Sequence, residues 1–173
     1  MGEILLNWLA GIPGEVQMMV LSGFPLTELR GSIPLAWTVM SSEWVWPWWK
    51  IYLLAVVGNL LPVPFLLWFL EPVSKYLMRW KIFNIFFNRL FEKARKRAGT
   101  KIEKYEALGL TLFVAIPLPV TGAWTGSAAA FLFGIPKRLA FPAIALGVAI
   151  AGAIVTLIMS GTLAGIGFLV GSN

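Results

Sequence analysis

Two apolar runs dominate this chain of 173 residues, and each is long enough to cross a lipid bilayer. A helix that spans the hydrocarbon core needs about 20 mostly apolar residues. The first run extends from Lys50 to Leu70, and the second from Leu139 to Val170. Charged residues make up only 13% of the chain, against roughly 25% in soluble domains. Both observations predict an all-α integral membrane protein.

The basic residues are concentrated in one part of the sequence. Ten of the fourteen Lys and Arg residues lie between Lys75 and Lys104, and Lys137 and Arg138 form the next basic pair. Cytoplasmic loops of membrane proteins collect Lys and Arg. We therefore expect residues 75–104 and the 137–138 pair to face the cytosol, with both termini of the chain outside.

Two further apolar segments, residues 14–41 and 105–135, are less regular than the long runs. If residues 105–135 crossed the membrane once, Lys137 and Arg138 would lie outside, against the positive-inside rule. A re-entrant helical hairpin, which enters and leaves on the same side, keeps both charges in the cytosol. The alternative is one proline-kinked span with two misplaced charges.

The two halves of the chain resemble each other. Each half has an irregular segment followed by a long span, over residues 14–70 and 105–170, and both pair Pro-Leu with a later Gly-Ser ("FPLTELRGS" and "IPLPVTGAWTGS"). Aligning the spans places Gly58 opposite Gly147. We expect residues 1–173 to form one membrane domain of two inverted repeats, a construction typical of secondary transporters. Chance similarity between Gly-rich spans is the alternative.

The stretch Phe113 to Ser127, "FVAIPLPVTGAWTGS", interrupts an otherwise apolar segment. Its two prolines remove amide donors, and its glycines allow a tight turn. Irregular backbone at membrane depth is tolerated only where it is buried in protein or lines a watery cavity. The threonine hydroxyls can bond the freed backbone groups or a ligand. The candidate site residues here are Pro117, Pro119, Thr121, Gly122, Trp124 and Thr125.

The matching stretch in the first half, "PLTELRGSIP", carries two charges. Ionisable residues at membrane depth usually pair and usually serve function. Glu28 is a candidate proton or cation site, and Arg30 is a candidate anion contact or its counter-ion. Because the two are two positions apart, they would face each other only across an unwound turn, which Gly31 and Pro34 would allow. A hairpin too shallow to bury them is the alternative.

The first span and the connector add two further expectations. In "GNLLPVP", Pro62 and Pro64 leave carbonyl groups unbonded near the middle of the span, and Asn59 adds a side-chain amide; a plain kink is the alternative. The connector, residues 71–104, is basic and aromatic, and we expect an amphipathic helix on anionic lipid headgroups. Its aromatic face suits lipid better than nucleic acid, so no nucleic-acid partner is expected.

The composition also limits the chemistry. The chain contains no Cys and no His, which excludes thiol chemistry and most transition-metal sites. We expect no metal, no cofactor and no enzymatic activity, because no catalytic nucleophile with a base is evident. Small-residue faces in the second span predict a homodimer.

Three blocks resemble the bacterial and archaeal family of putative small multi-drug export proteins: "SGFPLTELRGSIPLAW", "VGNLLPVPFLL" and "LFVAIPLPVTGAWTGSAAAFLFGIP". The resemblance covers roughly residues 20–160. That family is similar to the wider DedA (VTT-domain) membrane proteins, which carry two re-entrant hairpins and are linked to lipid-carrier transport. DedA proteins have arginines around the proline of the second hairpin, whereas residues 116–127 here carry no charge.

The resemblance implies a transporter of the bacterial or archaeal plasma membrane. Two functions compete. The first is a secondary transporter, with proton coupling an open option, that moves a small or amphipathic solute through a site between the hairpins. The second is a DedA-like flippase or scramblase of lipid or polyprenyl phosphate, in which Arg30 would contact the phosphate. The sequence does not identify the solute, the coupling ion or the transport direction.

Overall fold

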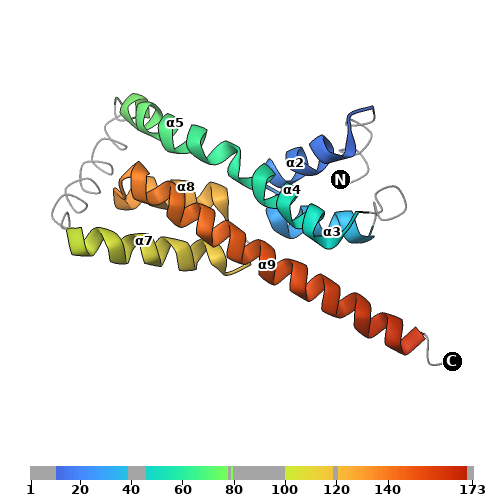
Figure 1. The fold of residues 1–173 in the computed structure, drawn as a ribbon. Coiled ribbons are helices and arrows are strands. Elements are labelled where there is room, and N and C mark those ends of the chain that lie inside the picture. The colour runs from blue at the N-terminus through green and yellow to red at the C-terminus, as the bar shows by residue number, and fades with distance from the viewer. Residues whose placement is uncertain (1–10, 39–45, 78, 80–99, 119–120, 171–173) are drawn as a thin grey trace. The chain divides into compact units, whose positions relative to one another are not determined.

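The computed structural model describes residues 11–38, 46–77, 79, 100–118 and 121–170 (Figure 1). These residues form helices joined by turns and contain no strand, which confirms the all-α prediction for the described part of the chain. The helices are α2 (Gly14–Gly23), α3 (Glu28–Thr38), α4 (Trp48–Leu60), α5 (Pro62–Leu77), α7 (Thr100–Ala115), α8 (Ala123–Phe133) and α9 (Lys137–Val170).

Both predicted long runs are helical, and both are long and apolar enough to cross a membrane. The membrane-capable stretches are Trp48–Val73 and Lys137–Gly161. In the first, the helix is interrupted at Leu61, and α5 begins at Pro62. Proline has no amide hydrogen and is well suited to the first position of a helix. The interruption therefore lies where "GNLLPVP" predicts a disturbance.

The chain divides into two compact units. The first, unit 1, comprises Met1–Asn59 and Ala151–Asn173; the second, unit 2, comprises Leu60–Ile150. Unit 1 therefore holds α2, α3, nearly all of α4 and the C-terminal part of α9. Unit 2 holds α5, α7, α8 and the N-terminal part of α9.

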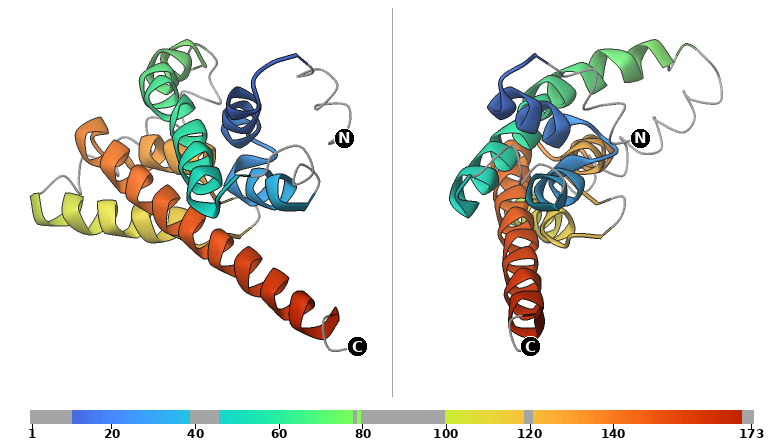
Figure 2. Two further views of the ribbon diagram at one scale, coloured as in Figure 1. Left: turned by 45° about the vertical axis from the view of Figure 1, so that its right-hand side comes forward. Right: turned by 90° about the vertical axis from the view of Figure 1, so that its right-hand side faces the viewer.

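In unit 1, α2 and α3 form a helical hairpin whose members pack against each other (Figure 2). Its core includes Met18, Ile33 and Ile51, whose side chains are fully or almost fully buried. The hairpin also packs closely on α4. A Cβ atom at Gly58 would lie 2.6 Å from Cα of Met19, so only glycine permits this approach.

In unit 2, α8 packs against both α5 and α7 (Figure 2). The approach of α9 to α7 in this unit also depends on a glycine. A Cβ atom at Gly147 of α9 would lie 2.7 Å from Cβ of Val114 and 2.8 Å from the carbonyl oxygen of Thr111 on α7. α8 ends at Gly134, whose φ of 71° is in the left-handed region that favours glycine at helix ends.

The predicted amphipathic helix of the connector falls mostly outside the described residues. α5 continues to Leu77 and α7 begins at Thr100, while residues 80–99 are not described. Lipid binding by residues 71–104 therefore stays a prediction.

Candidate functional site

The turn between α2 and α3, residues 24–27, is closed by local hydrogen bonds. The Phe24 amide donates to the Val20 carbonyl, and the Glu28 amide donates to the Phe24 carbonyl at 2.9 Å. The Thr27 hydroxyl donates back to the Leu21 carbonyl. Pro25 fits the turn because it has no amide hydrogen to lose.

The unwound turn that Gly31 and Pro34 would allow does not occur at these residues, because both lie inside α3. The chain reverses earlier, at residues 24–27. There the Thr27 hydroxyl donates a hydrogen bond to the Leu21 carbonyl, and Pro25 has no amide hydrogen that needs a partner. Pro34 is tolerated within the helix, and its carbonyl still accepts a hydrogen bond from the Thr38 hydroxyl at 2.8 Å.

Glu28 follows this turn and combines burial with an unusual backbone conformation. Its φ is 44°, and among the described residues it is the one non-glycine residue with a positive φ. Only 9% of its surface is exposed. Such conformations cost of order 1–3 kcal/mol and occur preferentially at functional sites. A buried carboxyl group in this position makes Glu28 the leading candidate residue in unit 1.

Arg30 is partly buried and is coupled electrostatically to Glu28. The negative charge of Glu28 acts favourably on the positive charge of the Arg30 guanidinium. The two charges influence each other although they are two positions apart.

Among the described residues, α3 and α4 each carry one buried side-chain oxygen without a hydrogen-bond partner. Within the described part of the chain, no donor reaches Ser32 Oγ on α3 or Asn59 Oδ1 on α4. Both side chains are almost completely buried. Buried polar groups are nearly always bonded, so each exception needs an explanation such as a bound water or ligand. Sequence reasoning selected Asn59 but missed Ser32, although Ser32 belongs to the Gly-Ser pair that both halves share.

In unit 2, the break predicted in "FVAIPLPVTGAWTGS" is confirmed: α7 ends at Ala115 and α8 begins at Ala123. The threonine hydroxyls bond the backbone freed by the break. Thr121 Oγ1 donates to the Ile116 carbonyl at 2.7 Å, and Thr125 Oγ1 accepts from the Gly122 amide at 2.9 Å. This geometry matches the first of the two roles expected for these hydroxyls.

The predicted site residues divide between the two units. Glu28, Arg30 and Asn59 belong to unit 1. The others belong to unit 2, where Gly122 is buried and Pro117 and Trp124 are partly buried, while Pro119 lies outside the described residues. Their binding roles remain predictions.

An ion pair joins the hairpin of unit 1 to its span. Lys50 Nζ donates to Glu15 Oε1 at 2.7 Å. The same ammonium lies 4.3 Å from the ring centroid of Trp46, within the range of a cation–π interaction. The hydrogen bond from Lys50 lowers the pKa of the Glu15 carboxyl.

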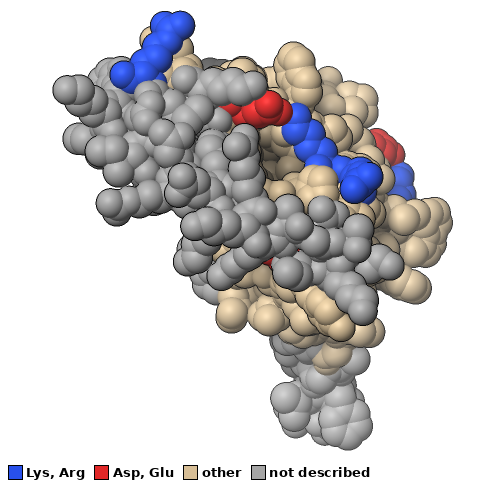
Figure 3. Space-filling view, turned by 90° about the vertical axis from the view of Figure 1, so that its left-hand side faces the viewer, with Lys and Arg blue, Asp and Glu red and all other residues tan. Residues whose placement is uncertain are grey.

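A second ion pair lies in unit 2. Lys137 Nζ, at the start of α9, lies 3.1 Å from Glu71 Oε2, near the end of α5. Figure 3 shows basic side chains next to an acidic one on this face. The end of the first membrane-capable stretch and the beginning of the second are therefore in contact.

The described residues contain no cluster of three or more Cys, His, Asp or Glu that could hold a metal ion. The candidate polar groups named above in unit 1 are instead the Glu28 carboxyl, the Arg30 guanidinium, the Asn59 amide and the Ser32 hydroxyl. Such a set suits proton binding and hydrogen bonding to a solute.

Comparison with known protein families gives a match over most of the chain. The family model described as "Putative small multi-drug export protein" matches residues 28–154, beginning at Glu28 itself. No curated protein and no solved structure matches the chain.

Proposed function

The chain belongs to the putative small multi-drug export protein family, and from this premise we propose that it is a proton-coupled secondary transporter of a small or amphipathic solute. Membership of an export family makes the chain a transporter in general. The single observation that supports proton coupling is Glu28, a buried carboxyl group held in a left-handed conformation beside Arg30. Protonation of Glu28 would remove a buried charge that Arg30 otherwise balances.

We place the protein in the plasma membrane of a bacterium or archaeon, with residues 105–135 as a re-entrant hairpin. The Glu71–Lys137 ion pair supports this arrangement, because it joins the end of one span to the start of the next and so puts both on one side. The chain between Glu71 and Lys137 must then cross the membrane an even number of times, or not at all. α8, with 11 residues, is too short to span about 30 Å of hydrocarbon.

The inverted-repeat proposal is supported by matching contacts in the two units. Aligning Pro25-Leu26 with Pro117-Leu118 places Met19 opposite Thr111. Gly58 approaches the backbone of Met19, and Gly147 approaches the carbonyl of Thr111. Each span thus uses the corresponding glycine to approach the corresponding residue of the preceding hairpin.

The orientation is tested by cysteine labelling, which is straightforward because the chain has no native cysteine. We expect Leu90→Cys and Lys137→Cys to react with an impermeant maleimide from the same, cytosolic side. Labelling of these two positions from opposite sides would refute the hairpin.

Proton coupling is tested with Glu28→Gln, which keeps the side-chain volume and removes the titrating group. Reconstituted protein would be assayed with ethidium as the transported probe and pyranine, trapped in the vesicles, as the pH reporter. We expect the wild type to move ethidium in response to a pH gradient and Glu28→Gln to lose that response. Glu3→Gln serves as the control and should retain it.

An unchanged rate and pH dependence in Glu28→Gln would refute proton coupling through this residue. The DedA-like alternative, a lipid flippase or scramblase, is then tested with the same vesicles. Dithionite would be added to vesicles with a fluorescent nitrobenzoxadiazole phospholipid in both leaflets. Bleaching of more than the outer-leaflet half would establish scrambling.

A homodimer is the proposed assembly, because small residues line the second span over Ala145–Val155 and permit close helix packing. Native mass spectrometry in mild detergent should show a mass twice that of the chain. A spectrum of monomer alone would contradict this assembly.

A further inference from the structure

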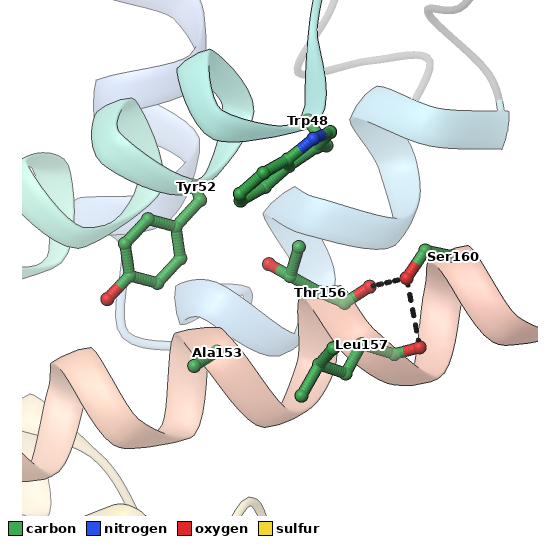
Figure 4. Close-up of a pocket in the computed structure, with 6 residues that line it drawn as sticks. All are labelled: Trp48, Tyr52, Ala153, Thr156, Leu157 and Ser160. Carbon is green, nitrogen blue, oxygen red and sulfur yellow. Dashed lines mark hydrogen bonds between the residues drawn. The ribbon is translucent and has the colours of Figure 1, made fainter.

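A pocket in unit 1 lies between α4 and α9, and none of the residues singled out above lines it. Its volume is about 390 Å³. The walls are formed by Trp48 and Tyr52 of α4 and by Ala153, Thr156, Leu157 and Ser160 of α9 (Figure 4). The volume is at the lower end of the range of ligand pockets, about 300–1,000 Å³, so the pocket suits a small molecule.

The aromatic wall is positioned by a glycine on the opposite helix. A Cβ atom at Gly152 would lie 3.1 Å from Cε2 of Tyr52 and 3.2 Å from Cγ2 of Val56. The missing side chain lets the Tyr52 ring lie close against α9. Figure 4 shows the rings of Tyr52 and Trp48 both on the side of α4 that faces α9. The rings of Trp48 and Tyr52 therefore both border this pocket.

The pocket also contains one hydroxyl with unused hydrogen-bonding capacity. Thr156 is 6% exposed, and within the described residues its Oγ1 has no hydrogen-bond partner. Ser160 differs, because its Oγ donates within α9, to the carbonyls of Thr156 at 3.0 Å and Leu157 at 3.1 Å (Figure 4). An unbonded buried hydroxyl is destabilising, and a ligand that bonds it recovers part of that cost.

We propose that this pocket binds a neutral aromatic molecule that carries one polar group. The rings of Trp48 and Tyr52 would pack against the ligand's ring, and the ligand's polar group would bond Thr156 Oγ1. None of the six lining residues is charged, so the pocket offers no counter-charge to an ion. Binding of this molecule does not depend on the proposed transport function.

Binding is tested by protection of a single cysteine. Ser160→Cys introduces the one thiol of the chain at the pocket wall, and Gly161→Cys introduces one at the next position. Gly161 is exposed, does not line the pocket, and has no atom within 4 Å of the place of a Cβ. The reagent is N-ethylmaleimide, and the probe is 1-naphthol, a neutral aromatic molecule with one hydroxyl.

We expect 1-naphthol at ten times its dissociation constant to slow labelling of Ser160→Cys about tenfold, because about one protein in ten is then unoccupied. Labelling of Gly161→Cys should be unchanged. Equal slowing at both positions, or slowing at neither, would overturn the proposal. Slow labelling of Ser160→Cys in phospholipid without 1-naphthol, compared with labelling in detergent, would also overturn the proposal. A lipid chain would then occupy the pocket.

Two further substitutions, each made together with Ser160→Cys, identify the groups that bind. Thr156→Val keeps the shape and removes the hydroxyl, and it should raise the half-protecting naphthol concentration about fivefold, the effect of one net hydrogen bond. Trp48→Ala should raise it at least as much. Trp49→Ala is the matched control, since Trp49 is adjacent and exposed but does not line the pocket. Unchanged protection in both Thr156→Val and Trp48→Ala would refute the assignment.

Protection requires no ion gradient, so the test separates this site from the transport proposal. Intact protection in a protein that transports nothing would sustain the binding site and count against the transporter. Transport of ethidium without protection by 1-naphthol would sustain the transporter and refute this site. Thermal unfolding of each variant in detergent checks that the fold is retained.

Discussion

The contact between Gly58 and Met19 provides the sharpest test of packing in unit 1. In Gly58→Ala, the new methyl carbon would lie 2.6 Å from Cα of Met19 and 2.9 Å from its carbonyl carbon. Both atoms are main-chain atoms of α2, so no side-chain rotation relieves the overlap. The helix itself must move. A shift of α2 would also stretch the hydrogen bond of 2.5 Å from Ser22 Oγ to the Ala55 carbonyl.

The expected loss of stability follows from three contributions. Overpacking costs about 1–3 kcal/mol, and a main-chain obstacle favours the upper end. Weakening one hydrogen bond adds about 1 kcal/mol. Replacing a glycine by alanine in a helix returns about 1 kcal/mol. The free energy of unfolding of Gly58→Ala should therefore fall by about 2–3 kcal/mol.

The assay is unfolding in mixed micelles by titration with dodecyl sulfate, followed by circular dichroism. Gly109→Ala on α7 is the matched control, because a Cβ there meets no atom within 4 Å. That variant should be as stable as the wild type or about 1 kcal/mol more stable. If Gly58→Ala unfolded at the same midpoint as Gly109→Ala, the close approach of α2 and α4 would be wrong.

Three further predictions follow from contacts in the two units. Gly147→Ala should lose about as much stability as Gly58→Ala, since its methyl carbon would lie 2.8 Å from the Thr111 carbonyl oxygen; a neutral effect in the same titration would contradict the repeat. The pKa of Glu15 is lowered from 4.5, so the stability from its pairing with Lys50 is present above pH 4.5 and is lost as the pH falls through the folded-state pKa. The difference in unfolding midpoint between wild type and Lys50→Met should shrink from pH 7 to about pH 3, and a constant difference would exclude this pairing. Arg30→Ala should yield less folded protein than Arg30→Lys in size-exclusion chromatography, because it leaves Glu28 without its countercharge; equal yields would argue against the coupling.

The features that could be predicted from the sequence are those that single residues impose on their own backbone. Proline cannot donate a hydrogen bond, so the interruptions at Leu61 and after Ala115 could be placed from Pro62 and Pro117. The long spans follow from length and apolarity.

The remaining features depend on which groups meet in space. Pro34 would allow an unwound turn, but the chain reverses at residues 24–27, and Pro34 lies within α3. Two features result from how the hairpin closes and packs. They are the positive φ of Glu28 and the Ser32 hydroxyl, which has no hydrogen-bond partner among the described residues. The pocket depends on Gly152, which looks like any other small residue of the span. No periodicity or motif in the sequence reveals these contacts.

The length of α9 makes bilayer thickness a variable that acts on this protein. Its membrane-capable stretch of 25 residues measures about 37 Å at 1.5 Å per residue, against about 30 Å of hydrocarbon in a typical bilayer. Such hydrophobic mismatch is relieved by tilting the helix or by local thickening of the lipid, at a cost of fractions of a kcal/mol per Å. Lipids with longer acyl chains reduce that cost. A membrane of greater thickness therefore stabilises α9 in a more upright orientation, and lipid chain length becomes a means of adjusting the protein without altering its sequence.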